Sequence, residues 1–305
     1  MKRIFAVLIF FCICMVVSAA DSAMFRFVPD SSIVAVETDI SALLKHPEIE
    51  KNLKNPEYVQ KRLQFEKETG VKYTDFKKIG LYITGAGKVF ALLQVDPGFD
   101  VQKVFAQNKV AFKKIRVSGR DILQLDKPLK NGRQVEVMTL APGFLVAGEA
   151  GDIAAYLKEK CGNASGLQQV VKQIPAGMPV WLAFVNADPK QIKGPKSLFF
   201  TLSLVGKEAK DCCLDLQVAC DSKDAAKILR NTIPFYLAMG LGMLIEDPDL
   251  SAKISRSLKC KSSGSVVSAQ LYLGADLCAE IGIYLTQNAA KILSRNAAEP
   301  ASEAK

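Results

Sequence analysis

Histidine is nearly absent: the chain of 305 residues has one, His46. Serine and cysteine hydrolases of the Ser-His-Asp or Cys-His type would have to use that residue. It directly precedes Pro47 at an expected helix start, where a polar capping residue is common. The chain also lacks a G-x-S-x-G nucleophile motif. These absences argue against the common hydrolytic triads.

Metal and phosphate motifs are missing as well. The adjacent pair Cys212-Cys213 on an expected strand points to opposite sheet faces, so it cannot chelate zinc as C-x-x-C does. Gly85-Ala86-Gly87-Lys88 lacks the first glycine and the final Ser or Thr of a phosphate loop, and it lies between two expected strands. The densest acidic run, 246–249, is interpreted as a helix stop at Asp247-Pro248. We therefore predict no catalytic, cofactor-binding or metal-binding residues and no cofactor.

Positive charge is present without clustering. The formal net charge is +9, yet lysines and arginines alternate with glutamates in the region 48–68, as on a solvated helix face. Nucleic-acid binders instead show a basic stripe interleaved with stacking aromatics. We expect no nucleic-acid partner.

The first twenty residues are typical of an export signal. Lys2 and Arg3 precede the apolar run 4–17, and Ser18-Ala19-Ala20 supplies the small residues of a cleavage site. We expect residues 1–20 to be a signal peptide cleaved after Ala19 or Ala20, with retention as an anchor as the alternative. Cleavage would leave no transmembrane span, and the mature protein would be periplasmic or extracellular.

Signal removal would leave six cysteines, all after residue 160, namely Cys161, Cys212, Cys213, Cys220, Cys260 and Cys278. Strand alternation predicts that Cys212 and Cys220 face the core and Cys213 faces outward. Free buried thiols and disulfides both remain open, with at most one or two bridges expected.

Alternating patterns and turn residues predict an α+β fold. It consists of two pseudo-repeated modules of antiparallel sheet, each covered on one face by helices, at residues 24–160 and 175–294. Residues 161–175 join the modules, and 297–305 form a disordered tail. The expected strands are 33–37, 78–84, 89–95, 112–117, 121–125, 134–140, 144–148, 180–185, 198–205, 212–220, 257–261 and 265–273. One helix is expected to have Pro47 in its first turn, and a second opens at Asn55-Pro56-Glu57. Further helices are expected over 101–107, 152–160, 223–246 and 276–293, and a break near Pro234 is the alternative to one continuous helix over 223–246.

Two pairs of similar segments indicate the duplication. Pro29–Val36 and Pro175–Leu182 both read as a proline, a polar turn and an apolar strand, 146 positions apart. Asp96 and Asp100 are matched to Asp221 and Asp224, because in both places an aspartate ends a strand and another opens a helix.

The segment 233–245 is apolar on all sides. Its favoured interpretation is a helix buried between a sheet and a neighbouring element. The alternative is an adaptable, methionine-containing surface for a partner or a lipid.

In its signal, its hairpins and the strand-aspartate-helix step of each half, the chain resembles uncharacterised exported bacterial proteins built from a duplicated α+β module. The resemblance carries no site residues and implies a non-catalytic envelope role. The leading hypothesis is a non-enzymatic exported envelope protein, a binding or scaffold module for a polypeptide or surface polymer. The alternative is a hydrolase with a carboxylate-based site. The oligomeric state stays open.

Overall fold

The structure, a computed structural model, describes residues 23–44, 54, 56–69, 71–126, 128, 134–175, 178, 180–186, 195–205, 211–284 and 288. The expected signal peptide 1–20, His46 and the expected tail 297–305 lie outside these residues.

The chain divides into two compact units, and the boundary falls between Thr201 and Leu202. Strand β9 (Ser197–Val205) crosses it. The unit that ends at Thr201 is called the first unit below. The expected junction at 161–175 lies inside this unit, because that segment packs into it. It forms helix α7 (Ser165–Val171), which contacts β1 (Ser32–Asp39) and β8 (Val180–Val185). Leu167 is 1% exposed.

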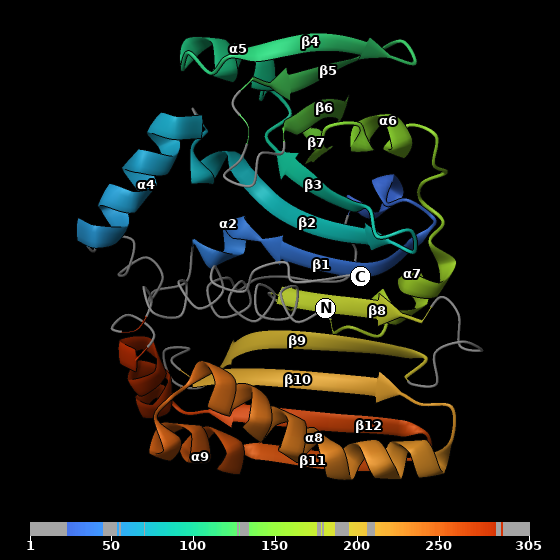
Figure 1. Cartoon of the computed structure of the whole chain (residues 1–305), viewed down its shortest axis with the longest axis vertical. Helices are drawn as coiled ribbons and strands as arrows, with labels where there is room; N and C mark the ends of the chain where they lie inside the picture. Colours follow the sequence, from blue (N-terminus) through green and yellow to red (C-terminus); the bar gives the residue numbers. More distant parts are fainter. Residues whose placement is uncertain are drawn as a thin grey trace, which may run out of the picture. The chain divides into compact units, whose positions relative to one another are not determined.

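The unit that ends at Thr201 is built on an antiparallel sheet with the strand order β8-β1-β2-β3-β7-β6-β5-β4 (Figure 1). Each of its strands overlaps a segment where the sequence predicts one, because apolar runs or alternating apolar residues occur there between turn residues. The remaining bounds are β2 (Phe76–Thr84), β3 (Val89–Val95), β4 (Phe112–Val117), β5 (Arg120–Leu125), β6 (Val135–Ala141) and β7 (Phe144–Glu149).

Helices cover both faces of this sheet, which corrects the expectation of one covered face. On one face, Phe105 of α5 (Val101–Gln107) belongs to a buried cluster that includes Leu145 of β7. On the other, Ile153 of α6 (Asp152–Tyr156) belongs to a cluster that includes Val146. Adjacent strand residues point to opposite faces, so Leu145 and Val146 belong to two separate cores. The other elements are α2 (Ile40–Leu43), α4 (Pro56–Thr69) and the short 3-10 turns Phe25–Phe27 and Tyr73–Asp75.

The unit that begins at Leu202 has the strand order β11-β12-β10, all antiparallel. Its helices pack on one face, as expected, against Leu214, Leu271 and Leu273. The opposite face carries exposed polar residues such as Gln270. The bounds are β10 (Asp211–Ala219), α8 (Lys223–Leu244), α9 (Pro248–Arg256), β11 (Leu258–Ser263) and β12 (Val266–Leu273), followed by a helical segment at 275–284.

Helix α9 was not expected, because Asp247-Pro248 reads as a helix stop. Asp247 is instead the N-cap of α9, and Pro248 occupies the first turn, where a missing N–H costs nothing. Within the described part of the chain, no helix combines the length and hydropathy needed to cross a bilayer.

The matched aspartates differ in role. The Asp100 carboxylate caps α5 by accepting a hydrogen bond from the Lys103 N–H at 3.1 Å. At α8 the cap is Ser222, which accepts from the Ala225 N–H at 3.1 Å, and Asp224 lies in the first helical turn. Asp100 therefore corresponds to Ser222 in function, so the equivalence of Asp100 with Asp224 is wrong.

Candidate binding surface

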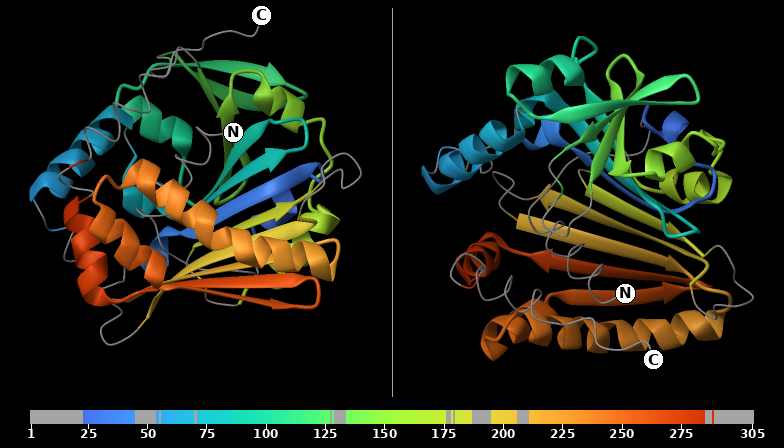
Figure 2. Two further views of the ribbon diagram at one scale, coloured as in Figure 1. Left: turned by 60° about the horizontal axis from the view of Figure 1, so that its bottom comes forward. Right: turned by 45° about the horizontal axis from the view of Figure 1, so that its top comes forward.

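Helix α8 lies across β11 and β12 and packs on them with one stripe of side chains (Figure 1, Figure 2). The stripe has the spacing of three and four residues that places side chains on one helix face. Ala226 is fully buried and Leu241 is half-buried in the cluster around Ile254 and Leu273. The inner face of α8 is thus fixed by the sheet.

The outer face of α8 exposes a group of large apolar side chains, here called the α8 ridge: Ile228, Phe235, Tyr236 and Met239. Ile228 and Phe235 are each 65% exposed, Tyr236 58% and Met239 45%. Phe235 follows Ile228 by seven positions, and Met239 follows Phe235 by four. These spacings place the three side chains in one line along the helix. The Phe235 and Tyr236 rings meet edge to face, with centroids 5.8 Å apart. The favoured interpretation of 233–245 was a helix buried between a sheet and a neighbouring element. Among the described residues, α8 does pack on β11, β12 and α9, but the ridge side chains stay exposed.

A groove of about 380 Å³ lies beside the ridge, between α8 and α9. Small side chains line most of it, which lets another element approach closely. The lining residues are Ala238, Ile245, Glu246, Pro248, Ser251, Ala252 and Ser255.

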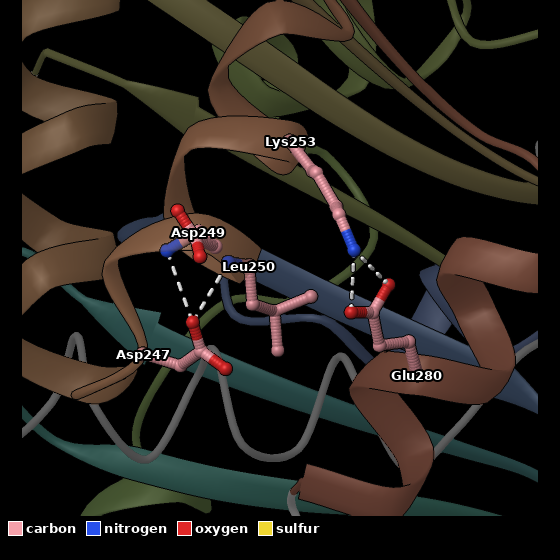
Figure 3. Close-up of polar contacts among 5 residues, drawn as sticks. All are labelled: Asp247, Asp249, Leu250, Lys253 and Glu280. Carbon is pink, nitrogen blue, oxygen red and sulfur yellow. Dashed lines mark hydrogen bonds and ion pairs between the residues drawn. The ribbon is translucent and has the colours of Figure 1, made fainter.

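Polar contacts hold α9, the second wall of this groove, in place (Figure 3). One Asp247 oxygen accepts hydrogen bonds from the N–H groups of Asp249 at 2.9 Å and Leu250 at 3.0 Å. Lys253 forms an ion pair with Glu280 of the 275–284 helix, with an N–O distance of 2.6 Å. This pairing raises the pKa of Lys253 by hydrogen bonding to Glu280. The groove wall is therefore anchored at both its start and its middle.

Charge is distributed unevenly along the ridge. No charged residue occurs from 231 to 245. The N-terminal part of α8 carries Lys223, Lys227 and Arg230 with one acid, Asp224. At the other end, the exposed residues Glu246, Asp247 and Asp249 are all acidic. Asp224, four positions before Ile228, continues the line of the ridge, whereas Lys227 and Arg230 lie on other sides of the helix.

A second candidate is a buried polar cluster in the first unit. Glu37 of β1 is fully buried, and its carboxylate accepts hydrogen bonds from the Tyr82 hydroxyl and the Lys78 ammonium, each at 3.4 Å. Burial, reinforced by the charge of Glu37, raises the pKa of Tyr82 well above its usual value. Trp181, paired with Glu37 across the β1–β8 ladder, has a buried Nε1 with no hydrogen-bond partner among the described residues. Neither the α8–α9 groove nor the depression beside α5 is lined by Glu37 or Tyr82, and the three side chains satisfy one another, so we interpret the cluster as structural.

A depression of about 290 Å³ lies beside α5 and β5. It contains two carboxylates, Asp100 and Asp121. The hydrogen bond from Lys114 lowers the pKa of Asp121, and Asp100 already caps α5. A glycosidase-type general acid needs a raised pKa. This arrangement gives the carboxylate-hydrolase alternative no support.

The six cysteines at 161, 212, 213, 220, 260 and 278 are free thiols. As alternation predicts, Cys212 lies in the apolar cluster with Leu214, while Cys213 is on the opposite sheet face beside Asp215. Cys213 is nevertheless buried. Among the described residues, no group of three or more His, Cys, Asp or Glu side chains is placed to hold a metal ion.

Comparison with known proteins adds little. No protein-family model and no curated protein matches the chain. Among solved structures, crystal form I of TP0453, a Treponema protein, is similar with a TM-score of 0.46 and 9% identity. The match covers 86% of this chain and 97% of that chain. At this TM-score the similarity supports no conclusion about function.

Proposed function

We propose that this chain is a non-enzymatic exported envelope protein, periplasmic or extracellular, that binds a polypeptide through the α8 ridge. The observation that carries the proposal is the exposure of Phe235 and Tyr236, flanked by Ile228 and Met239, on a helix whose other face is fixed to a sheet. Contiguous exposed apolar side chains mark interaction sites on soluble proteins. Aromatic residues supply much of the energy in such interfaces.

The form of the surface favours a helical polypeptide over a polymer of sugars or phosphates. Ile228, Phe235 and Met239 follow helical spacing, and the α8–α9 groove beside them is lined by small side chains. An amphipathic helix binds such a surface with its own apolar stripe. The stretch 231–245 carries no charge that would attract an anionic polymer.

The duplication of the scaffold is also part of this proposal. Two features support it. In each unit a strand is followed by a helix and later by a hairpin whose last strand pairs with that first strand: β3, α5, β6 and β7 in one, and β10, α8, β11 and β12 in the other. The β1–β8 ladder is centred on Val36 and Leu182, which are 146 positions apart. The same offset separates the two proline-turn-strand segments.

Affinity capture from the native envelope tests the proposal. The bait is the mature protein, compared with Phe235→Ser/Met239→Ser and with a control that removes exposed apolar groups elsewhere, Val89→Ser/Val266→Ser. Val89 is 46% and Val266 36% exposed. We expect a polypeptide that stays with the wild type and the control and is lost from the ridge variant. Capture that is equal for all three baits would contradict the proposal.

A further inference from the structure

The stretch 101–120 contains six basic residues and no acidic residue, unlike the mixed charges at 48–68. It forms α5 and β4, and β4 is the last strand of the first unit's sheet (Figure 1). The ring centroids of Phe105 in α5 and Phe112 in β4 are 5.9 Å apart. Positive charge is therefore clustered on a sheet edge and on the helix beside it. The six basic residues are all exposed: Lys103, Lys109, Lys113, Lys114, Arg116 and Arg120.

The tight hairpin between β4 and β5 fixes which backbone groups of β4 are paired. Its two turn residues, Ser118 and Gly119, both have positive φ angles, 51° and 76°. This is the pattern of a two-residue type I′ turn, which sets the register of the strands that it joins. The flanking residues Val117 and Arg120 face each other across the ladder. Val117 therefore directs its N–H and C=O groups toward β5.

Hydrogen-bonded pairs alternate with unbonded pairs along an antiparallel ladder. At the far end of this ladder the Asp126 N–H donates to the Ala111 carbonyl at 3.0 Å, so the odd-numbered positions of β4 face β5. The N–H and C=O groups of Phe112, Lys114 and Arg116 therefore point away from β5. Among the described residues no further strand pairs with β4, so these groups form an open edge.

Side-chain alternation divides the residues of β4 between the two faces of the sheet. Lys114 and Arg116 lie on the same face as Leu123, which is buried in the cluster beside α5. Ile115 lies on the opposite face and packs against the cluster beside α6. Each face of the open edge thus has its own character, cationic on one side and apolar on the other.

Asp121 of β5 offsets part of this positive charge. Its carboxylate pairs with the Lys114 ammonium at an N–O distance of 2.8 Å, yet the Lys114 side chain remains 47% exposed. Arg116 lies opposite Asp121 in the ladder and is also exposed. Two cations next to one carboxylate leave the edge with an excess of positive charge.

We propose that β4 binds an extended acidic segment of another polypeptide, which adds to the sheet as an antiparallel strand. This site goes beyond the proposed function, because it lies in the first unit and not on the α8 ridge. Strand addition gains affinity from main-chain hydrogen bonds and specificity from alternate side chains. Ligand residues paired with Lys114 and Arg116 would be two positions apart, where acidic side chains face both cations. An apolar residue between them would lie beside Ile115.

Two other occupants fit this edge less well. Pairing with β4 of a second copy would bring basic residues against basic residues, and like charges that face each other destabilise a ladder. Basic side chains on edge strands generally prevent such self-pairing, but they do not prevent pairing with an acidic strand. Nucleic acids stack their bases on exposed aromatic rings. The two aromatic residues of 101–120, Phe105 and Phe112, pack instead in the cluster beside α5.

Fluorescence anisotropy with a labelled, end-capped peptide, Gly-Val-Glu-Val-Glu-Val-Gly, provides the test. We expect saturable binding to the mature protein that is weakened about tenfold or more by Lys114→Glu/Arg116→Glu. The control Lys158→Glu/Lys172→Glu reverses two exposed lysines of the same unit away from this edge, and its affinity should stay within about twofold of the wild type. Circular dichroism of each variant checks that it is folded.

Two modified peptides test the strand pairing itself. N-methylation of both glutamates removes the N–H groups that face β4 in the antiparallel arrangement, so it should abolish binding. N-methylation of the central valine removes an N–H that faces away, so the affinity should stay within about threefold of the parent peptide.

Several outcomes would overturn the inference. Absence of binding up to millimolar peptide excludes the ligand class, and binding unaffected by Lys114→Glu/Arg116→Glu places it elsewhere. Equal affinities for both N-methylated peptides reduce the interaction to charge attraction without strand addition. Displacement of the peptide by lower concentrations of a single-stranded oligonucleotide or of phosphatidylglycerol vesicles assigns the edge to another polyanion. The proposal for the α8 ridge does not depend on these results.

Discussion

At the level of single residues, the polar groups of the first unit have structural roles. Glu37 is fully buried and is satisfied by Tyr82 and Lys78. Removing one member of such a group leaves the others buried with fewer partners, which usually costs about 1–3 kcal/mol. No sequence pattern predicted the burial of Glu37 or its hydrogen bonds. Glu37 ends the expected apolar strand 33–37, where a charged residue is ordinarily exposed.

Tyr82 should make the stability of the protein fall at high pH. Its pKa is raised in the folded state, mainly by burial, so between pH 10 and the folded pKa only the unfolded chain loses this proton. The free energy of unfolding should then fall as pH rises, by up to about 1.4 kcal/mol per pH unit for one tyrosine. Urea denaturation at pH 8 and pH 11 measures this slope. Tyr82→Phe should lessen it, and an unchanged slope would contradict the buried hydroxyl.

The thiols should react in an order set by burial and pKa. Cys161 is exposed, whereas burial, with smaller contributions from Cys278 and Cys213, raises the pKa of Cys212 to about 12. Thiolates are the reactive species. Iodoacetamide at neutral pH should therefore label Cys161 well before Cys212, as followed by peptide mass spectrometry. After denaturation without reductant all six should react, and fewer than six would reveal a disulfide.

At the level of elements, alternation and turn residues predicted the strands, while the coverage of the sheets was harder to anticipate. Leu145 and Val146 are adjacent and both apolar, which is the available sign that β7 is buried on two faces. Helix α9 was missed because Asp-Pro can end one helix and begin the next. The exposure of α8 could not be read from its composition, since an apolar helix is equally compatible with a core and with a binding surface.

The cap of α9 gives a prediction at this scale. Asp247→Ala removes two hydrogen bonds, to the N–H groups of Asp249 and Leu250. We expect a loss of about 1 kcal/mol in the free energy of unfolding, the usual cost of a lost N-cap. Asp249→Ala is the matched control, because this residue is in the first turn but does not cap it. Equal losses for the two variants would argue against the cap.

At the level of the whole molecule, the proposed function combines an expected export signal with a scaffold on which the α8 ridge is exposed among the described residues. The position of the unit boundary at Thr201 and Leu202 depends on contacts between distant segments, which a single sequence does not reveal. Residues 161–175 were expected to be a junction, yet Leu167, Val170 and Val171 have helical spacing and are buried in α7.

Export should be visible in the mass of the mature protein. A signal peptidase that cleaves after Ala19 or Ala20 leaves Ala20 or Asp21 as the first residue. Intact-mass spectrometry of the protein recovered from the producing cells distinguishes these ends. A membrane fraction that retains Met1 to Ala19 would mean that the segment is kept as an anchor.

The central claim, that the α8 ridge binds a polypeptide, is tested most directly by photo-crosslinking in the native envelope. A photoreactive benzoylphenylalanine replaces Phe235 in one variant and Val266, exposed on β12, in a control. After irradiation, mass spectrometry should identify a polypeptide joined at position 235 and no such product at position 266. Adducts at position 235 that contain only lipid, or no adduct at all, would contradict the account.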